Sequence, residues 1–238
     1  MKAAYDFHMH SCLSPCGDED MTPNNMVNMA LLCELDIIAI TDHSSCGNCR
    51  AAMRAGERAG LAVVPGMELT TAEEAHILCL FPGIDAAEEF DRYVYARLMD
   101  VKNDPAIFGR QLYLNENDEI VGEEPRLLTT ATEIGVYDVQ QLCLSHGGVA
   151  IPAHLNKSSY SILSSMGFVA PDMGFTTFEI TATCRPELLT REHPELAGAH
   201  FIKDSDAHFL GQIGTAQSTL ELPELTAQAV VDHFRALL

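Results

Sequence analysis

Residues 3–10 read Ala-Ala-Tyr-Asp-Phe-His-Met-His, a mostly apolar run that ends in two histidines separated by one residue. An apolar run of this length predicts a buried β-strand at Ala3–Met9. Alternate side chains of a strand point to the same side, so His8 and His10 are expected to face one metal ion together. This first strand therefore predicts both a part of the core and the place where the chemistry lies.

Six further apolar runs follow, and each is typical of a parallel strand that is covered on both faces. They lie at Ile37–Thr41, Leu61–Pro65, His76–Phe81, Gly148–Ala153, Phe175–Thr181 and Phe201–Ser205. Helical patterns separate them, at Asn24–Cys33, Asn48–Ala59, Asp85–Met99, Tyr137–Ser145, Ser158–Met166 and Leu225–Leu238. This alternation predicts an α/β fold, a βα-barrel-like single domain over residues 1–238. A doubly wound parallel sheet is the alternative, because a count of strands does not separate the two folds.

One segment, Val101–Thr132, breaks the alternation. Within it, Gln111–Gly122 contains two short alternating segments on either side of the polar stretch Asn115–Asp118, which predicts a β-hairpin. We interpret residues 101–132 as an insertion, and insertions over a barrel rim often shape access of the substrate.

The composition excludes several classes of protein. The chain has 238 residues, of which 47% are hydrophobic, so it is expected to be globular. Its 14 Lys and Arg stand against 34 Asp and Glu, which gives a formal net charge of −20. This charge disfavours binding of long nucleic acid or of an anionic membrane surface. No apolar stretch reaches the roughly 18 residues of a membrane span, and the first residues contain no apolar signal core, so a cytoplasmic location is expected. The oligomeric state stays open.

Histidines and carboxylates collect at the ends of the predicted strands, where α/β folds place their sites. A single histidine beside an apolar run is more often a structural residue. Here, however, six predicted strands each have a histidine or a carboxylate residue at one end. The residues concerned are His8, His10, Asp42, His43, Glu68, His76, His154, Asp206 and His208. Together they predict a polynuclear metal site.

The motifs around these residues resemble, in order, those of the polymerase and histidinol phosphatase (PHP) family. They are His8-Met9-His10-Ser11, Thr41-Asp42-His43, Gly66-Met67-Glu68, His76-Ile77-Leu78, Ala153-His154 and Ser205-Asp206-Ala207-His208, and they extend from about residue 5 to about residue 210. The resemblance implies a distorted seven-stranded βα-barrel, similar to a TIM barrel, with a trinuclear metal site.

The resemblance also implies roles for the ligands. His8, His10, Glu68 and Asp206 would hold one ion, Glu68 would bridge to a second ion held by His76 and His154, and His43 and His208 would hold the third. The third ion would also take an aspartate from the loop after the first strand. That loop departs from the family pattern by a small insertion, and counting back from Thr22-Pro23 selects Asp18, with Asp20 as the alternative.

Such a site suits hydrolysis of a phosphoester, because divalent ions neutralise phosphate oxygens and lower the pKa of bound water to roughly 7. We therefore expect a phosphatase that uses a metal-bound hydroxide on a small phosphomonoester of the nucleotide type, with three Zn²⁺, Mn²⁺ or Fe²⁺ ions. His43, His208 and Asp206 are the candidate catalytic residues. Either His43 or His208, or alternatively a metal-bound water, would protonate the leaving group, and Lys157 and Arg185 are the candidates for binding phosphate. The alternatives are a 5′→3′ exonuclease on short oligonucleotides and a non-catalytic metal-binding module.

The eight cysteines allow two interpretations. Cys12 and Cys16 lie in the loop after the first predicted strand, and Cys46 and Cys49 lie in the loop after the second. These four thiols could form an accessory zinc, iron–sulfur or redox site, or they could be reduced thiols that fill space in the loops. The remaining cysteines lie in helix or strand patterns and are expected in the core.

Overall fold

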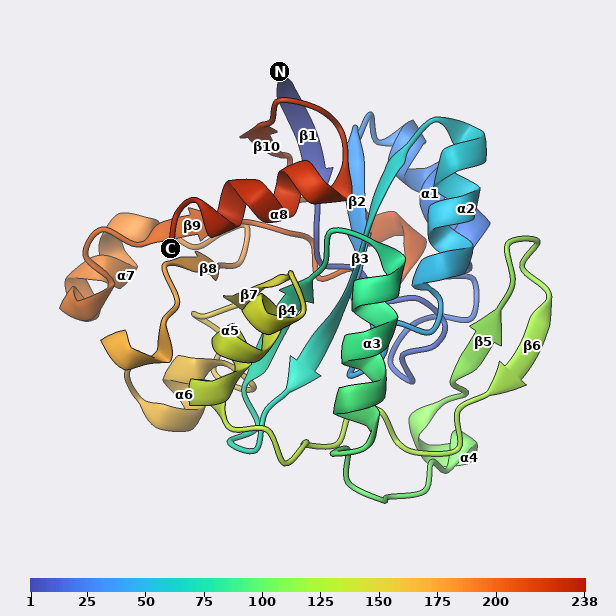
Figure 1. Ribbon diagram of the computed structural model, residues 1–238, viewed down its shortest axis with the longest axis horizontal. Coiled ribbons are helices and arrows are strands. Elements are labelled where there is room, and N and C mark those ends of the chain that lie inside the picture. The colour runs from blue at the N-terminus through green and yellow to red at the C-terminus, as the bar shows by residue number, and fades with distance from the viewer.

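A curled mixed sheet of six strands forms the centre of the computed structural model, which describes residues 1–238 (Figure 1). The strand order is β10-β1-β2-β3-β4-β7. The bounds are Lys2–Asp6 for β1, Ile37–Ile40 for β2, Ala62–Thr70 for β3, His76–Leu80 for β4, Val149–Pro152 for β7 and Ser218–Glu221 for β10. Two further strands, β8 (Thr177–Glu179) and β9 (His200–Ile202), form a separate parallel pair.

The strand directions correct the expectation of an all-parallel arrangement. β1, β2 and β3 are parallel, but β4 runs antiparallel to both β3 and β7. The reason is that only Thr71–Ala75 joins β3 to β4, whereas a parallel crossover needs a dozen or more residues. Each of the seven predicted segments overlaps a strand, but these strands do not form one seven-stranded sheet, and β10 beside β1 was not predicted.

Backbone hydrogen bonds carry the curl past the edge of the six-stranded sheet. After β7, the Leu155 amide donates to the Glu179 carbonyl at 2.8 Å, which joins the β8–β9 pair to β7. After β9, Ala207 forms a parallel bridge with Met9, and the His10 amide donates to the Ala207 carbonyl at 2.9 Å. The end of β1 therefore lies beside a segment almost two hundred residues later.

Helices cover the sheet and begin where the sequence offers caps. The longer ones are α1 (Pro23–Leu32), α2 (Cys49–Ala59), α3 (Ile84–Tyr95), α5 (Val136–Ser145), α7 (Pro186–Glu192) and α8 (Ala227–Arg235). The Thr22 side chain caps α1, and Gly60 ends α2 with a φ of 79°. The predicted helix at Ser158–Met166 is shorter, because a capping box at Ser161 starts α6 at Ile162 and leaves it to end at Met166. None of the helices combines the length and the apolar composition needed to cross a bilayer.

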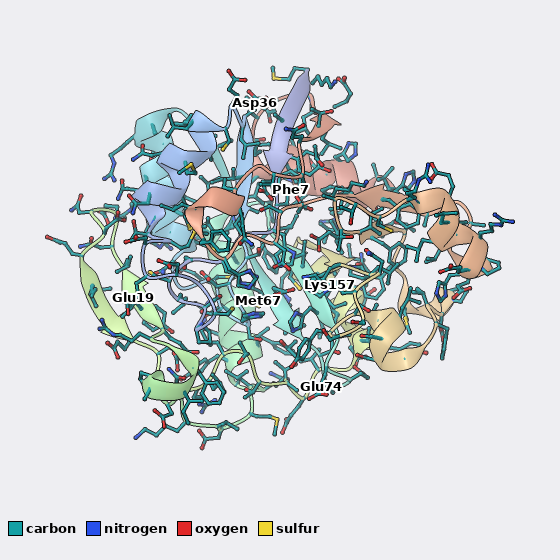
Figure 2. The ribbon with its side chains drawn as sticks, turned by 180° about the vertical axis from the view of Figure 1, so that it is seen from behind. Phe7, Glu19, Asp36, Met67, Glu74 and Lys157 are labelled. Carbon is teal, nitrogen blue, oxygen red and sulfur yellow. The ribbon has the colours of Figure 1, made fainter.

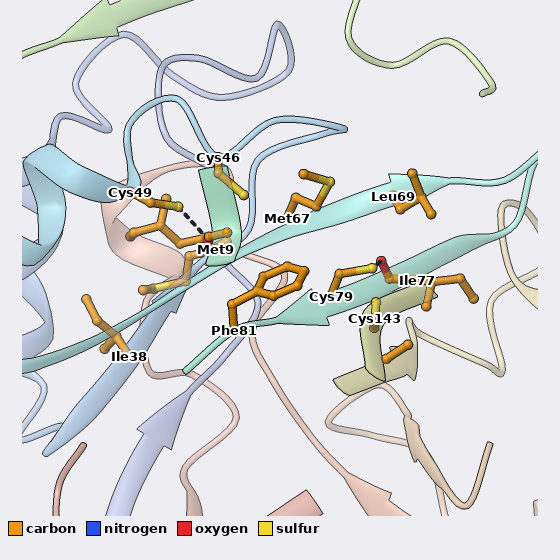
Figure 3. Close-up of a cluster of buried hydrophobic side chains, with 14 of the residues drawn as sticks. Met9, Ile38, Cys46, Cys49, Met67, Leu69, Ile77, Cys79, Phe81 and Cys143 are labelled. Atoms are coloured by element: carbon orange, nitrogen blue, oxygen red, sulfur yellow. Dashed lines mark hydrogen bonds between the residues drawn. The ribbon is translucent and has the colours of Figure 1, made fainter. Parts of the chain in front are cut away.

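Two apolar clusters pack on the sheet. The smaller one lies under α8, where Phe7 meets Phe234 edge to face with ring centroids 6.1 Å apart. The larger one has 38 buried residues and includes Cys46, Cys49, Cys79 and Cys143 (Figure 3). Burial raises the pKa of the Cys46 thiol well above its ordinary value, and the Cys46 and Cys49 thiols both donate to the Gly66 carbonyl. Cys46 and Cys49 therefore fill the core, and so do Cys79 and Cys143. Cys33, which was also expected in the core, is exposed at the end of α1, and Cys184 is half-buried.

The segment 101–132 lies over the loop that follows β1. It contains the short helix α4 (Pro105–Phe108) and the antiparallel strands β5 (Leu112–Leu114) and β6 (Ile120–Glu123), which project at the edge of the molecule in Figure 1. Asn48 attaches β5 to the body: its Nδ2 donates to the Ser11 hydroxyl at 2.9 Å and to the Leu112 carbonyl at 3.0 Å, and its Oδ1 accepts from the Leu114 amide at 2.9 Å. Cys12 packs against Leu112 and Leu114, so this thiol also fills space.

Candidate metal centre

Glu68 is the hub of a cluster of imidazoles. It is buried near the end of β3, and its two carboxylate oxygens lie close to five histidines that come from four separate segments. Oε1 lies 2.9 Å from His76 Nδ1, 3.1 Å from His154 Nε2 and 3.2 Å from His8 Nε2, and Oε2 lies 3.1 Å from His43 Nδ1 and 3.3 Å from His10 Nε2. The predicted strand ends therefore meet around one carboxylate.

Asp206 closes the cluster from the opposite end of the chain. Its Oδ1 lies 3.3 Å from His8 Nε2 and 3.4 Å from His10 Nε2. Asp206 has a φ of 53° and His154 has a φ of 31°, in the left-handed region that non-glycine residues rarely adopt. Strained backbone of this kind is concentrated at functional sites, where the surrounding structure holds it in place.

The donor atoms of this cluster fit divalent metal ions. The Nε2 atoms of His8 and His10 lie 3.3 Å apart, and both point toward the same carboxylates. His43 Nδ1 and His154 Nδ1 are buried without a hydrogen-bond partner. Two groups of donors, His8 with His10 and Glu68, and His43 with Glu68 and His76, each lie within 4.8 Å of one another. Imidazole and carboxylate donors suit borderline metals such as zinc, manganese and iron.

A second layer of polar residues orients the imidazoles. Glu179 from β8 holds His8 Nδ1 with oxygens at 3.0 and 3.1 Å, which leaves His8 Nε2 free to bind an ion. The same carboxylate accepts the His154 amide at 2.7 Å. Asp42 has a similar role and is not itself in the cluster: it accepts from the Ser14 hydroxyl at 2.7 Å, and Ser14 Oγ lies 3.1 Å from His10 Nδ1.

Charges inside the cluster oppose the effect of burial. Burial alone would raise the pKa of Glu68, but neighbouring imidazoles hold it well below its usual range. Burial alone would lower the pKa of His10, but hydrogen bonds to Asp206 and Glu68 raise it to about 9. Burial lowers the pKa of His43 well below its ordinary value, which keeps this imidazole neutral. The carboxylates and the His10 imidazole therefore favour each other's charged forms.

The loop after β1 does not bring the predicted aspartate to this cluster. Asp18 is exposed, and its Oδ1 accepts from the Asp20 amide at 2.9 Å, while only its backbone reaches His208, at 2.8 Å from amide nitrogen to carbonyl oxygen. Asp20, the alternative, is also exposed. The donor that lies near His10, His43 and His208 is Cys16. Residue type alone does not single out this thiol in the sequence, because its approach to the histidines depends on the conformation of the loop.

The cluster forms the floor of a cavity of about 380 Å³. Lys157 is the one Lys or Arg in its lining, and its ammonium pairs with Asp206. Figure 2 shows Lys157 near the middle of this face of the molecule. Tyr160 stacks on His76 with ring centroids 4.9 Å apart, and Thr129 reaches the cavity from the segment 101–132. Tyr160 was missed because the sequence placed it inside a helix, whereas here it lies in the loop before α6.

Arg185, the second residue predicted to bind phosphate, does not line this cavity. It is exposed at the start of α7 and lines a neighbouring groove with Asn156, Ser158 and Thr183. The remaining predicted residues, His43, His76, His154, Asp206 and His208, all line the cavity or its floor.

Comparisons with known proteins show which family the chain resembles. The family model for the PHP domain matches residues 6–105, which confirms the predicted resemblance. A 5′-3′ exoribonuclease, Rnm, from Salmonella typhimurium is 36% identical over 74 residues, which are 30% of this chain and 24% of that protein.

Solved structures share the fold at lower identity. The lesion-specific endonuclease PfuEndoQ from Pyrococcus furiosus superposes with a TM-score of 0.74 at 14% identity, over 100% of this chain and 57% of that one. A candidate metal-dependent phosphoesterase from Bifidobacterium adolescentis has a TM-score of 0.60 at 18% identity, over 98% and 95% of the two chains. The chain thus spans about a quarter of the exoribonuclease and somewhat over half of the endonuclease.

Proposed function

From the PHP domain that this chain carries at residues 6–105, we propose that the protein is a metal-dependent hydrolase of phosphoester bonds. The observation that carries the proposal is the buried carboxylate of Glu68, surrounded by imidazoles at the floor of an open cavity. A carboxylate with a purely structural role would not require so many imidazole partners. The proposed substrate is a small phosphomonoester of the nucleotide type.

The proposed ligands form three overlapping sets. His8, His10, Glu68 and Asp206 would hold one ion, Glu68, His76 and His154 a second, and His43 and His208 a third. Divalent ions bound there would neutralise phosphate oxygens and allow water to act as the nucleophile at neutral pH. Zinc, manganese and iron all suit these donors.

Lys157 is the chain's own group for binding phosphate. It is the only Lys or Arg in the lining of the cavity, and its ammonium now pairs with Asp206. A phosphate that enters the cavity would replace Asp206 as the partner of this ammonium. Its ammonium can also donate a proton to the oxygen of the leaving group. We propose that His43 or His208, which line the same cavity together with Asp206, protonates the leaving group.

Tyr160 supports a nucleotide as the substrate. Its ring is half exposed and packs on one side against His76, so its other face is open. Stacking of a base on an aromatic side chain contributes about 1–3 kcal/mol. A cavity of about 380 Å³ with one cation and one aromatic ring is suited to a single nucleotide.

A second candidate is a 5′→3′ exonuclease that acts on short oligonucleotides. The relative that is 36% identical over 74 residues is named a 5′-3′ exoribonuclease, and another likeness in fold is an endonuclease solved with a 27-mer duplex that contains an abasic lesion. A net charge of −20 disfavours a long polyanion outside the cavity but not a few nucleotides within it.

A comparison of substrates separates these candidates. The metal-loaded protein is assayed with nucleoside monophosphates, nucleoside bisphosphates, sugar phosphates and a 5′-phosphorylated trinucleotide, and bound metal is measured in parallel. We expect release of inorganic phosphate from a mononucleotide. Release of mononucleotides from the trinucleotide favours the exonuclease instead. Metal-loaded protein that hydrolyses no member of the panel supports the non-catalytic module and contradicts the proposed function.

A further inference from the structure

Cys16 lies where a third metal ion would need a donor. Its sulfur and the ring nitrogens of His10, His43 and His208 all lie within 4.8 Å of one another. Cys16 also lines the cavity, and the structure records no disulfide for it. The other cysteines of the two loops, Cys12, Cys46 and Cys49, are all buried in apolar surroundings.

The two histidines beside Cys16 have nitrogens that make no hydrogen bond in the protein. His43 is 5% exposed, and its Nδ1 lies 3.1 Å from Glu68 Oε2 without forming a hydrogen bond. His208 Nδ1 lies 2.8 Å from the Asp206 carbonyl and donates to it, so its Nε2 carries a free lone pair. A buried polar atom without a partner is costly, and a metal ion would satisfy it.

The loop holds Cys16 in this place through its backbone. The Gly17 amide donates to the Ser14 carbonyl at 2.9 Å, and the Asp18 amide donates to the His208 carbonyl at 2.8 Å. A Cβ at Gly17 would lie 2.4 Å from the Ser11 carbonyl oxygen, so only glycine fits this tight turn. The turn directs the Asp18 side chain to the Asp20 amide and leaves Cys16 facing the histidines.

We propose that Cys16, as a thiolate, joins His43 and His208 as a protein ligand of the third metal ion, in place of the loop aspartate. This proposal rests on the metal-dependent function proposed above. Binding forms a bond from the metal to sulfur and releases the thiol proton to solvent, with no change of oxidation state. A thiolate beside two imidazoles selects zinc, iron(II) or cobalt(II) over manganese or magnesium, because soft donors prefer these metals.

Cobalt spectroscopy tests the ligand directly. The full-length chain, freed of metal, is titrated with Co²⁺, and the near-ultraviolet band of charge transfer from thiolate to cobalt is recorded. We expect the band in the native protein and in Cys33→Ser, which removes the other exposed thiol, and its loss in Cys16→Ser. Circular dichroism verifies that each variant is folded. A band that persists in Cys16→Ser, or that is absent from the native protein, overturns the proposal.

Thiol labelling gives a second measurement that needs no turnover. Zn²⁺ is expected to protect Cys16 from a disulfide-exchange reagent, while Cys33 reacts at the same rate and serves as the internal reference. If Asp18→Asn loses one bound metal ion and Cys16→Ser does not, Asp18 is the ligand of the third ion and the proposal is overturned. Because neither readout requires hydrolysis, a protein with the band but without phosphoesterase activity keeps Cys16 as a ligand and contradicts only the proposed function.

Discussion

At the scale of single residues, the site depends on Glu68. A buried carboxylate is stable only when it is paired, and here the pairing comes from five imidazoles on four different segments. Each oxygen faces at least two ring nitrogens, so this one side chain is the contact common to two of the proposed metal ions. Glu179 lies one layer further out and touches only His8 and the backbone of His154.

Replacing these two carboxylates should therefore have unequal effects. We expect Glu68→Gln to lose bound metal. Its kcat/KM should fall by more than roughly 100-fold, which is the largest usual effect of replacing a residue that only orients a metal ligand. Glu179→Gln should lower metal affinity about 10- to 100-fold, because it only loosens His8. Elemental analysis and titration of the metal-free protein measure both. Full metal content in Glu68→Gln would contradict the central place given to this residue.

Lys157 and Arg185 form a matched pair of basic residues. We expect Lys157→Ala to lower kcat/KM for a phosphomonoester about 10- to 100-fold, since a hydrogen bond to a charged group is worth about 1.5–3 kcal/mol. Arg185→Ala is the control, because Arg185 lies in a neighbouring groove. Initial rates over a range of substrate concentrations separate KM from kcat. Equal losses in the two variants would show that the groove also binds substrate.

At the scale of elements, the tight connection between β3 and β4 brings two ligands together. Glu68 and His76 lie near the same end of this antiparallel pair, in which Thr70 is opposite His76. The close approach of the strands requires Gly66, where a Cβ would lie 2.7 Å from the Cys79 carbonyl oxygen. The position of the hub carboxylate thus depends on a glycine two residues before it.

A methyl group at Gly66 should disturb this pair. We expect Gly66→Ala to lower the free energy of unfolding by about 1–3 kcal/mol, the usual cost of overpacking. Gly83→Ala is the matched control, because no atom lies within 4 Å of a Cβ built there. Urea denaturation measures both. An unchanged midpoint in Gly66→Ala would mean that β4 moves away without cost.

Asn48 holds the segment 101–132 to the body through hydrogen bonds to two elements. Asn48→Ala leaves the Leu114 amide and the Leu112 carbonyl without these partners, so we expect a loss of about 1–3 kcal/mol. Hydrogen exchange should become faster in β5 and β6 before the central sheet changes. Asn117→Ala, at the exposed turn between these strands, should leave exchange in β5 unchanged. Uniform protection in both variants would contradict the role of Asn48.

The elements also show where sequence reasoning reaches its limit. Apolar runs and the polar residues at their ends predicted the strands and nearly all residues of the cluster, because buried positions and metal-binding positions both require particular residue types. The direction of a strand does not change its residue types, so the reversal of β4 was missed. β10 was missed because alternate residues are exposed at the sheet edge. Cys16 and Tyr160 depended on loop conformations that composition alone does not specify. The extent of one domain over residues 1–238 stays a prediction.

At the scale of the whole molecule, bound metal is expected to add stability. Glu68 and most of the imidazoles around it are buried, and ions that bind there only in the folded state stabilise that state by mass action. At a free metal concentration of 100 times Kd this amounts to about 2.7 kcal/mol. For a chain of this size, that corresponds to a decrease in Tm of roughly 5–10 °C on chelation.

Differential scanning calorimetry with and without a chelator measures this decrease. Glu68→Gln serves as the reference, because its Tm should hardly respond to the chelator. If chelation leaves the Tm of the native protein unchanged although bound metal has been removed, the cluster does not couple metal binding to folding.

The bridge between Met9 and Ala207 joins segments that the ribosome synthesises at very different times. His8 and His10 are synthesised almost two hundred residues before their carboxylate partner Asp206. A nascent chain therefore cannot assemble the ligand set proposed for the first ion until Asp206 has been added. Metal uptake at this set would follow that step, and an interrupted translation product that ends before Asp206 would lack one carboxylate of the centre.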